Sequence, residues 1–214
     1  MRIAAVVLAS LAGLAMSSPA WAGNILWYED NTSGQSGSAV YGGIGLTPHT
    51  YTYTNNTGTF NSLMAQGGWD LVIWGEENAT SWSACSSALT NYVNGGGRVI
   101  GATWQTTGFS ALMQGTQAST NFTSITTTSH PIFANCGSVI TTSNTSFGIG
   151  SQAYSPGSGA TGLGTAGNGY GVILGNSGRT LLDGPLFPTY SPLSNGQQFI
   201  ANEINFLITH TLSG

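Results

Sequence analysis

The segment from residue 59 to residue 104 alternates helical and strand-like patterns, and this alternation constrains the fold more than any other feature of the chain. Its two apolar runs, at 70–74 and 98–102, are short, and between them apolar side chains recur at helical spacing over 81–93. Glycines separate the runs from their neighbours. Short apolar runs joined by amphipathic helices are typical of parallel sheets, whose strands need long crossover connections. The segment therefore predicts an α/β fold.

Similar runs extend this prediction along the chain. We expect a buried strand at 24–28, an edge strand at 50–54, where Thr and Tyr alternate, a hairpin over 169–183, and a final helix from about Ser194. The segment 155–169 is almost all Gly, Ser, Ala and Thr and is expected to be a flexible loop. The expected fold class is α/β: a doubly wound, mostly parallel, flavodoxin-like sheet with strand order second, first, third, fourth. Helices should cover both faces, and a C-terminal hairpin plus helix should follow.

The N-terminus has the pattern of a secretory signal peptide. Arg2 precedes an apolar run from Ile3 to Met16, and the tripeptide AWA at 20–22 fits a signal-peptidase site. The run is shorter than the roughly 20 residues that span a membrane. We therefore expect residues 1–22 to be a signal peptide and residues 23–214 to be a single domain, secreted to the periplasm or beyond, with no membrane span in the mature chain.

The charge of the chain excludes some partners. Charged residues make up 5% of the sequence, lysine is absent, and only Arg98 and Arg179 remain basic once the signal peptide is removed. Nucleic acids and anionic membranes are bound through clustered Lys and Arg, so neither is an expected partner. The polar positions are filled by Gly, Ser, Thr and Asn instead. A carbohydrate or a cell-surface component is the partner that we expect.

The chain has two cysteines, Cys85 and Cys136. In an exported protein an even count favours a disulfide, which is the pairing that we expect. The alternative is that Cys85 is a buried apolar residue of its helix. No CxxC motif or Cys/His spacing indicates a zinc site.

Several motifs together resemble a known superfamily. They are GGWDLVIW, the helix leading into YVNGGGRVIG, the turn at His130-Pro131-Ile132, the hairpin GYGVILG and the closing helix QQFIANEINFL. In this order they resemble the class I glutamine amidotransferase-like superfamily, and within it the ThuA-like (trehalose-utilisation-type) secreted members. Amidotransferases of this superfamily carry a nucleophilic cysteine after the fourth strand, and Thr103 stands at that position here. No late His-x-Glu pair is present to activate a hydroxyl, so the resemblance implies the fold without amidotransferase activity.

Four acidic residues follow two strands that should be neighbours. Glu29 and Asp30 follow the first strand, and Glu76 and Glu77 follow the third. Such carboxylates could bind Mg²⁺ or Ca²⁺, or act as catalytic acid and base. Alternatively they cap the helices that follow. The sequence does not determine whether a metal ion binds there, and no organic cofactor is predicted.

Two further residues are candidates for ligand binding. Trp104 follows the fourth strand and should lie near a cleft, and His130 could join the carboxylates. The first interpretation is a secreted binding or surface-associated module for carbohydrate. This interpretation favours a protein without enzymatic activity. One alternative is a hydrolase based on the carboxylates, with or without a divalent cation. Another is a self-assembling extracellular subunit, indicated by the low charge.

Overall fold

The computed structural model describes residues 22–30, 34–77, 81–104, 108–143 and 149–209. Its first half forms a parallel sheet of four strands in the order β2-β1-β3-β4. These strands are β1 (Asn24–Glu29), β2 (Thr50–Thr54), β3 (Leu71–Glu76) and β4 (Val99–Thr103). The predicted α/β class and strand order are both confirmed.

The second half extends this sheet with mostly antiparallel strands. The hairpin of β10 (Gly169–Gly175) and β11 (Thr180–Asp183) is confirmed, and β11 continues the sheet by pairing parallel to β4. Beyond β10 the order runs through β9, β6 and β7, and a side branch pairs β8 with β10 and β5. The bounds of these strands are β5 (Gly115–Thr120), β6 (Ser124–Thr126), β7 (Val139–Thr141), β8 (Gln152–Pro156) and β9 (Thr161–Ala166).

The flexible loop expected at 155–169 is wrong, because the end of β8 and all of β9 lie in it. The small residues of this segment make room for larger neighbours. A Cβ atom on Gly162 would lie 2.3 Å from the ring of Tyr170 on the adjacent strand. A Cβ on Gly164, which has a φ of +63°, would lie 2.6 Å from Ile125. The glycines that suggested flexibility are therefore requirements of close packing.

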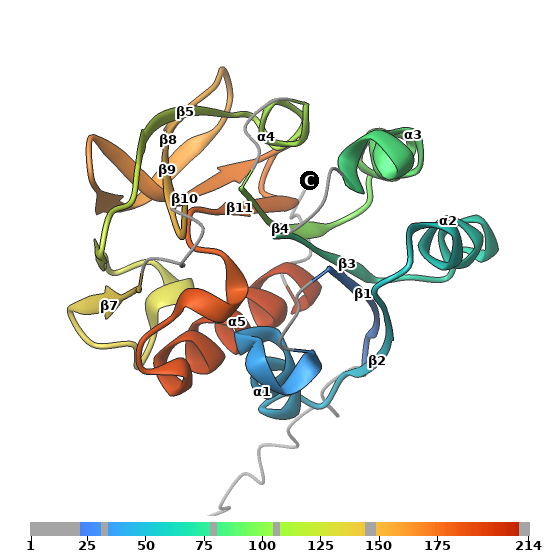
Figure 1. Cartoon of the computed structure of the whole chain (residues 1–214), viewed down its shortest axis with the longest axis horizontal. Coiled ribbons are helices and arrows are strands. Elements are labelled where there is room, and N and C mark those ends of the chain that lie inside the picture. Colours follow the sequence, from blue (N-terminus) through green and yellow to red (C-terminus); the bar gives the residue numbers. More distant parts are fainter. Residues whose placement is uncertain (1–21, 31–33, 78–80, 105–107, 144–148, 210–214) are drawn as a thin grey trace, which may run out of the picture.

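Helices cover both faces of the parallel sheet (Figure 1). On one face lie α1 (Ala39–Gly45) and α5 (Leu193–Thr209), and on the other lie α2 (Thr57–Gln66), α3 (Ser81–Asn94) and the short α4 (Phe109–Leu112). The described residues also form the 3₁₀ turns η1 (Gln35–Gly37), η2 (Pro131–Phe133) and η3 (Phe187–Thr189). Within the described residues no helix is long and apolar enough to cross a bilayer.

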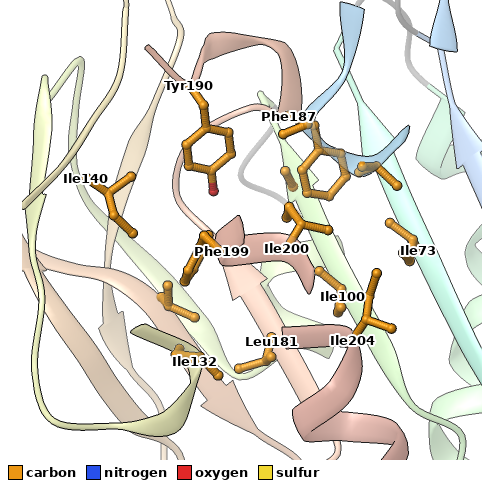
Figure 2. Packing of buried hydrophobic residues seen from close by; sticks show 14 of the residues in the cluster. Ile73, Ile100, Ile132, Ile140, Leu181, Phe187, Tyr190, Phe199, Ile200 and Ile204 are labelled. Carbon is orange, nitrogen blue, oxygen red and sulfur yellow. The ribbon is translucent and has the colours of Figure 1, made fainter. Parts of the chain in front are cut away.

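Alternation along the strands divides the core into two layers. Ile25 and Trp27 of β1 face the α1/α5 side, whereas Leu26 and Tyr28 face the α2/α3 side. Because both faces are covered, β1, β3 and β4 are buried on both sides, whereas the edge strand β2 is partly exposed. Figure 2 shows the α1/α5 layer, in which side chains of α5 pack on β3, β4 and β11 (Phe199, Ile200 and Ile204 from the helix; Ile73, Ile100 and Leu181 from the strands).

The expected Cys85–Cys136 disulfide is wrong, because both cysteines are free thiols. Cys85 belongs to the core layer beneath α2 and α3, whereas Cys136 belongs to the layer around α5 on the opposite face of the sheet. A bond would have to pass through the sheet. The alternative, Cys85 as a buried apolar residue, is confirmed. Burial raises the pKa of Cys85 to about 12 and that of Cys136 to about 11.

Candidate functional site

The carboxyl ends of β1, β3 and β4 lie side by side because these parallel strands are neighbours. Glu29 is in register with Gly75, and Glu76 is in register with Thr103. The register therefore places the acids after β1 and β3 at one edge of the sheet, together with Thr103.

Glu76 and Thr103 form a closed pair. The hydroxyl of Thr103 donates to Oε2 of Glu76 at 2.7 Å, and the backbone N–H of Trp82 donates to Oε1 at 2.8 Å. Neither Glu76 nor Thr103 has exposed surface. Burial raises the pKa of Glu76, although these two hydrogen bonds partly offset that effect. Beneath the pair, the side-chain amide of Gln152 donates to the carbonyl of Thr103.

Asp30 joins the end of β1 to the region after β3 and to the start of α3. Its Oδ1 accepts the backbone N–H of Glu77 at 2.6 Å, and its Oδ2 accepts the hydroxyl of Ser81 at 2.9 Å. Ser81 in turn accepts the hydroxyl of Tyr28 at 2.7 Å. A carboxylate beside the N-terminus of a helix, where Asp30 contacts the first residue of α3, is favoured by the helix dipole. Asp30 thus acts as a link between elements.

Glu29 makes the equivalent link to α1. Its Oε2 accepts the indole N–H of Trp27 at 2.9 Å and the hydroxyl of Ser38 at 2.7 Å, while Ser38 also caps α1. The side chain is almost completely buried. It passes so close to the neighbouring strand that a Cβ on Gly75 would lie 2.7 Å from Cγ of Glu29.

Glu77 differs from the other three acids because its carboxyl group faces another carboxyl group. The side chains of Glu77 and Glu29 hydrogen-bond to each other. Burial, the nearby charge of Glu29 and that bond raise the pKa of Glu77 far above its ordinary value. Because a bond between two carboxyl groups needs a proton, Glu77 is protonated at neutral pH. Its Oε1 is buried and has no hydrogen-bond partner in the described part of the chain.

These contacts define what the carboxylates can do. Glu29, Asp30 and Glu76 each accept at least two hydrogen bonds from the chain itself. Among the described residues no group of three or more His, Cys, Asp or Glu side chains is arranged to hold a metal ion. The binding of a divalent cation stays a prediction. The geometry is that of a hydrogen-bonded network that ties three strand ends to two helix starts.

The two predicted ligand-binding residues lie in different places. Trp104 is at the strand-end site, where its backbone N–H donates to the carbonyl of Glu76 at 3.1 Å, and its ring packs against the α1/α5 core layer. His130 caps η2 by accepting the N–H of Ile132, and its ring centroid is 5.0 Å from that of Phe206. Phe206 belongs to the last turns of α5, which reach the beginning of β1. The structure therefore does not bring His130 to the carboxylates.

A second pair of acids was missed by the sequence reasoning. Asp183 ends β11 and Glu203 lies in the middle of α5, and both side chains are fully buried. Asp183 follows an apolar strand in the same way as the four predicted acids, so the same rule would have found it. Glu203 stands four residues after Phe199 and four before Leu207, within the apolar face of its helix.

Comparison with solved structures identifies the architecture. A proposed GMP synthase subunit from Thermoplasma acidophilum aligns with a TM-score of 0.55 and 10% identity over 89% of this chain and 97% of that one. SMU.1228c aligns with a TM-score of 0.52 and 11% identity over 79% of each chain. This chain has a glutamine amidotransferase-like fold. The mmIFT52 N-terminal domain also aligns with it, with a TM-score of 0.55 and 10% identity over 89% of this chain and 100% of that one.

At these identities the likeness shows the amidotransferase-like fold alone. No protein-family model matches the sequence, and no curated protein matches it either. The function of this amidotransferase-like chain must therefore be argued from its own side chains.

Proposed function

We propose that the protein is a secreted, non-catalytic binding module of the amidotransferase-like fold, related to the ThuA-like members, and that its ligand is a carbohydrate. The observation that carries this proposal is the Thr103–Glu76 pair. Thr103 stands where amidotransferases carry their cysteine, and its hydroxyl proton is directed at Glu76 with both side chains inaccessible.

A nucleophile needs an open approach for its substrate and a base that can take its proton. Thr103 has no exposed surface, and Oε1 of Glu76 is held by the backbone of Trp82. The only two cysteines of the chain are buried in the core layers, and neither follows β4 in the sequence. The side chains at this edge therefore support a structural network better than they support acyl transfer.

The absence of strand-end chemistry is tested with Thr103→Val, which replaces the hydroxyl by a methyl group of similar size. Wild-type protein and variant are compared for hydrolysis of glutamine and of p-nitrophenyl acetate. We expect both to match the rate in buffer. A wild-type rate that is well above buffer and is abolished in Thr103→Val would refute the proposal.

Secretion is tested separately by the mass of the protein recovered outside the cytoplasm. Removal of residues 1–22 leaves a chain that begins at Gly23. Recovery of the full-length chain from the cytoplasm, still starting at Met1, would count against export.

One observation favours a second candidate, a carboxylate-based hydrolase. Glu77 and Glu29 share a proton, and Glu77 keeps some exposed surface. A protonated and an ionised carboxyl group side by side can serve as acid and base. If that function holds, Glu77→Gln should lower hydrolysis of a glycoside substrate at least tenfold. Equal rates in the variant and the wild type would leave the binding module as the better account.

A further inference from the structure

A groove lies at the edge of the sheet opposite the strand-end acids. Two depressions, each with a cavity volume of about 400 Å³, adjoin at Asn91 and Tyr92 of α3. The first lies at the beginnings of β3 and β4 and is lined by Trp69, Asp70, Arg98 and the glycines at 95–97. The second lies between α2 and α3, which are neighbours in Figure 1, and is more apolar. We call these two depressions together the amino-edge groove.

The aromatic walls of the amino-edge groove are held in place by hydrogen bonds. The hydroxyl of Tyr92 donates to the carbonyl of Trp69 at 3.0 Å, and the indole N–H of Trp69 donates to the carbonyl of Leu63 at 2.8 Å. The Tyr92 ring lies so close to the backbone of Gly97 that a Cβ there would be 2.4 Å from it. Two fixed aromatic side chains thus border the first depression before any ligand arrives, which lowers the entropic cost of binding.

The backbone of the glycine turn offers no site for an anion. The N–H groups of Gly95, Gly96 and Gly97 all donate to carbonyls in the last turn of α3, at 2.9, 3.0 and 2.8 Å. Anion-binding loops need backbone N–H groups that point into the site, and these three point back into the helix.

The charged side chains of the groove balance each other. Asp70 and Arg98 line the same depression, so its net charge is zero. Oδ2 of Asp70 accepts the backbone N–H of Asn24 at 2.8 Å, which fixes the carboxylate. The guanidinium of Arg98 makes no hydrogen bond or ion pair to the described part of the chain. An apolar ligand would desolvate both charges without replacing their hydrogen bonds, at a cost in binding free energy.

We propose that the amino-edge groove binds a neutral oligosaccharide that passes over Tyr92, with sugar units in both depressions. Sugar hydroxyls supply both donors and acceptors, which suit the carboxylate of Asp70, the guanidinium of Arg98 and the amide of Asn91. The aromatic rings provide apolar contact area for the C–H faces of the sugar, in the manner of ligand sites that combine apolar walls with a few polar groups. This inference rests on the proposed function and gives the ligand a location.

The test uses the mature chain and isothermal titration with soluble cello-, malto- and chito-oligosaccharides. We expect at least one series to bind, with Arg98→Gln and Asp70→Asn each weakening the affinity about tenfold or more. Tenfold corresponds to about 1.4 kcal/mol, which is within the range for a hydrogen bond to a charged group. Asp70→Asn keeps an oxygen that can accept the N–H of Asn24. Thermal unfolding of each variant checks that it is folded.

A matched pair of substitutions locates the site. Trp69→Phe changes the groove, whereas Trp104→Phe makes the same change at the opposite edge of the sheet. Loss of affinity in Trp69→Phe alone supports the inference. Loss in Trp104→Phe alone overturns the location but leaves a carbohydrate-binding module standing.

Two further outcomes also overturn the inference. One is the absence of binding to all three oligosaccharide series, and the other is Arg98-dependent binding of an uncharged peptide in their place. Neither result would support catalysis by the strand-end residues, because the comparison of wild type with Thr103→Val tests that hypothesis independently.

Discussion

The carboxyl groups of Asp183 and Glu203 hydrogen-bond to each other in the interior of the protein, where neither side chain has any exposed surface. No N–H or O–H donor among the described residues reaches either carboxyl group. The two groups are therefore held by the hydrogen bond between them, which requires one shared proton. The pair joins the end of β11 to the middle of α5. Burial and the partner's charge raise the pKa of Glu203 well above its ordinary value, and burial raises that of Asp183 to about 8.

This pair is expected to stabilise the fold in acid and to lose that contribution at alkaline pH. Because both pKa values are raised on folding, the folded chain binds protons more tightly than the unfolded chain. The stabilisation is therefore complete below about pH 4, where exposed carboxyls titrate, and it is lost as the pH rises through about 8, the pKa of Asp183. The slope is about 1.4 kcal/mol per pH unit for each group that must ionise.

Urea unfolding at a series of pH values measures this dependence. Glu76 and Glu77 also have raised pKa values and contribute with the same sign, so the comparison that matters is with the double variant Asp183→Asn, Glu203→Gln. We expect the double variant to lose less stability between acid and alkaline pH than the wild type. Identical pH profiles would contradict a shared proton at this position.

Removing the hydroxyl of Thr103 should destabilise the fold. In Thr103→Val, Oε2 of Glu76 stays buried but loses its donor, at a cost of about 1–3 kcal/mol in the free energy of unfolding. Thr103→Ser keeps the hydroxyl and serves as the control. Denaturant unfolding should therefore rank the wild type and the serine variant above the valine variant. Equal loss in both variants would contradict this prediction, because the serine variant keeps the hydroxyl that donates to Glu76.

Gly75 and Gly45 form a matched pair for alanine substitution. Gly75→Ala would push a Cβ to 2.7 Å from Glu29 and 3.0 Å from Phe187, so we expect a loss of about 1–3 kcal/mol in stability. Gly45 ends α1 and has nothing within 4 Å of the added Cβ. Gly45→Ala should therefore be neutral or stabilising by about 0.5–1 kcal/mol. The melting temperatures of the two variants give the comparison, and a harmless Gly75→Ala would argue against the close approach of Glu29.

The two thiols should be inaccessible in the folded protein and reactive after unfolding. Cys85 and Cys136 are buried and have raised pKa values, so little thiolate is present at neutral pH. A thiol-reactive dye should label the native chain slowly and should label both cysteines in concentrated guanidinium without any reductant. If no thiol appears until a reductant is added, the two cysteines are bonded after all.

The order of short strand patterns was enough to predict the parallel half of the sheet, because β1, β3 and β4 are short apolar runs and β2 shows the Thr/Tyr alternation of an edge strand. It also placed Glu29 and Glu76 at the correct edge, since that depends only on strand direction. Side-chain partners could not be predicted in the same way. The contact of Glu29 with Ser38, or of Asp30 with Ser81, depends on how helices from distant parts of the sequence pack on the sheet.

Four errors have the same physical origin. Predicting the state of the cysteines requires knowing which face of the sheet each one occupies. Predicting the place of His130 requires knowing the position of α5. The strand β9 was missed because glycine is required at 162 and 164 by the side chains of Tyr170 and Ile125. These side chains pack against the two glycines only in the folded sheet, so the sequence alone does not show the requirement. Glu203 was overlooked because its partner, Asp183, lies on a strand that the sequence alone does not bring to the helix.

Withdrawal of Glu29, Glu76, Asp183 and Glu203 into the interior has a consequence for how the molecule meets others in solution. These are four of the seven acids of the chain, and residues 23–214 contain only two arginines. The electric field outside the protein is therefore weak, and long-range steering of a partner is negligible. Its association rate constants with partners should lie in the range of encounters without electrostatic steering, about 10⁵–10⁶ M⁻¹s⁻¹. They should change little between low and high salt concentration.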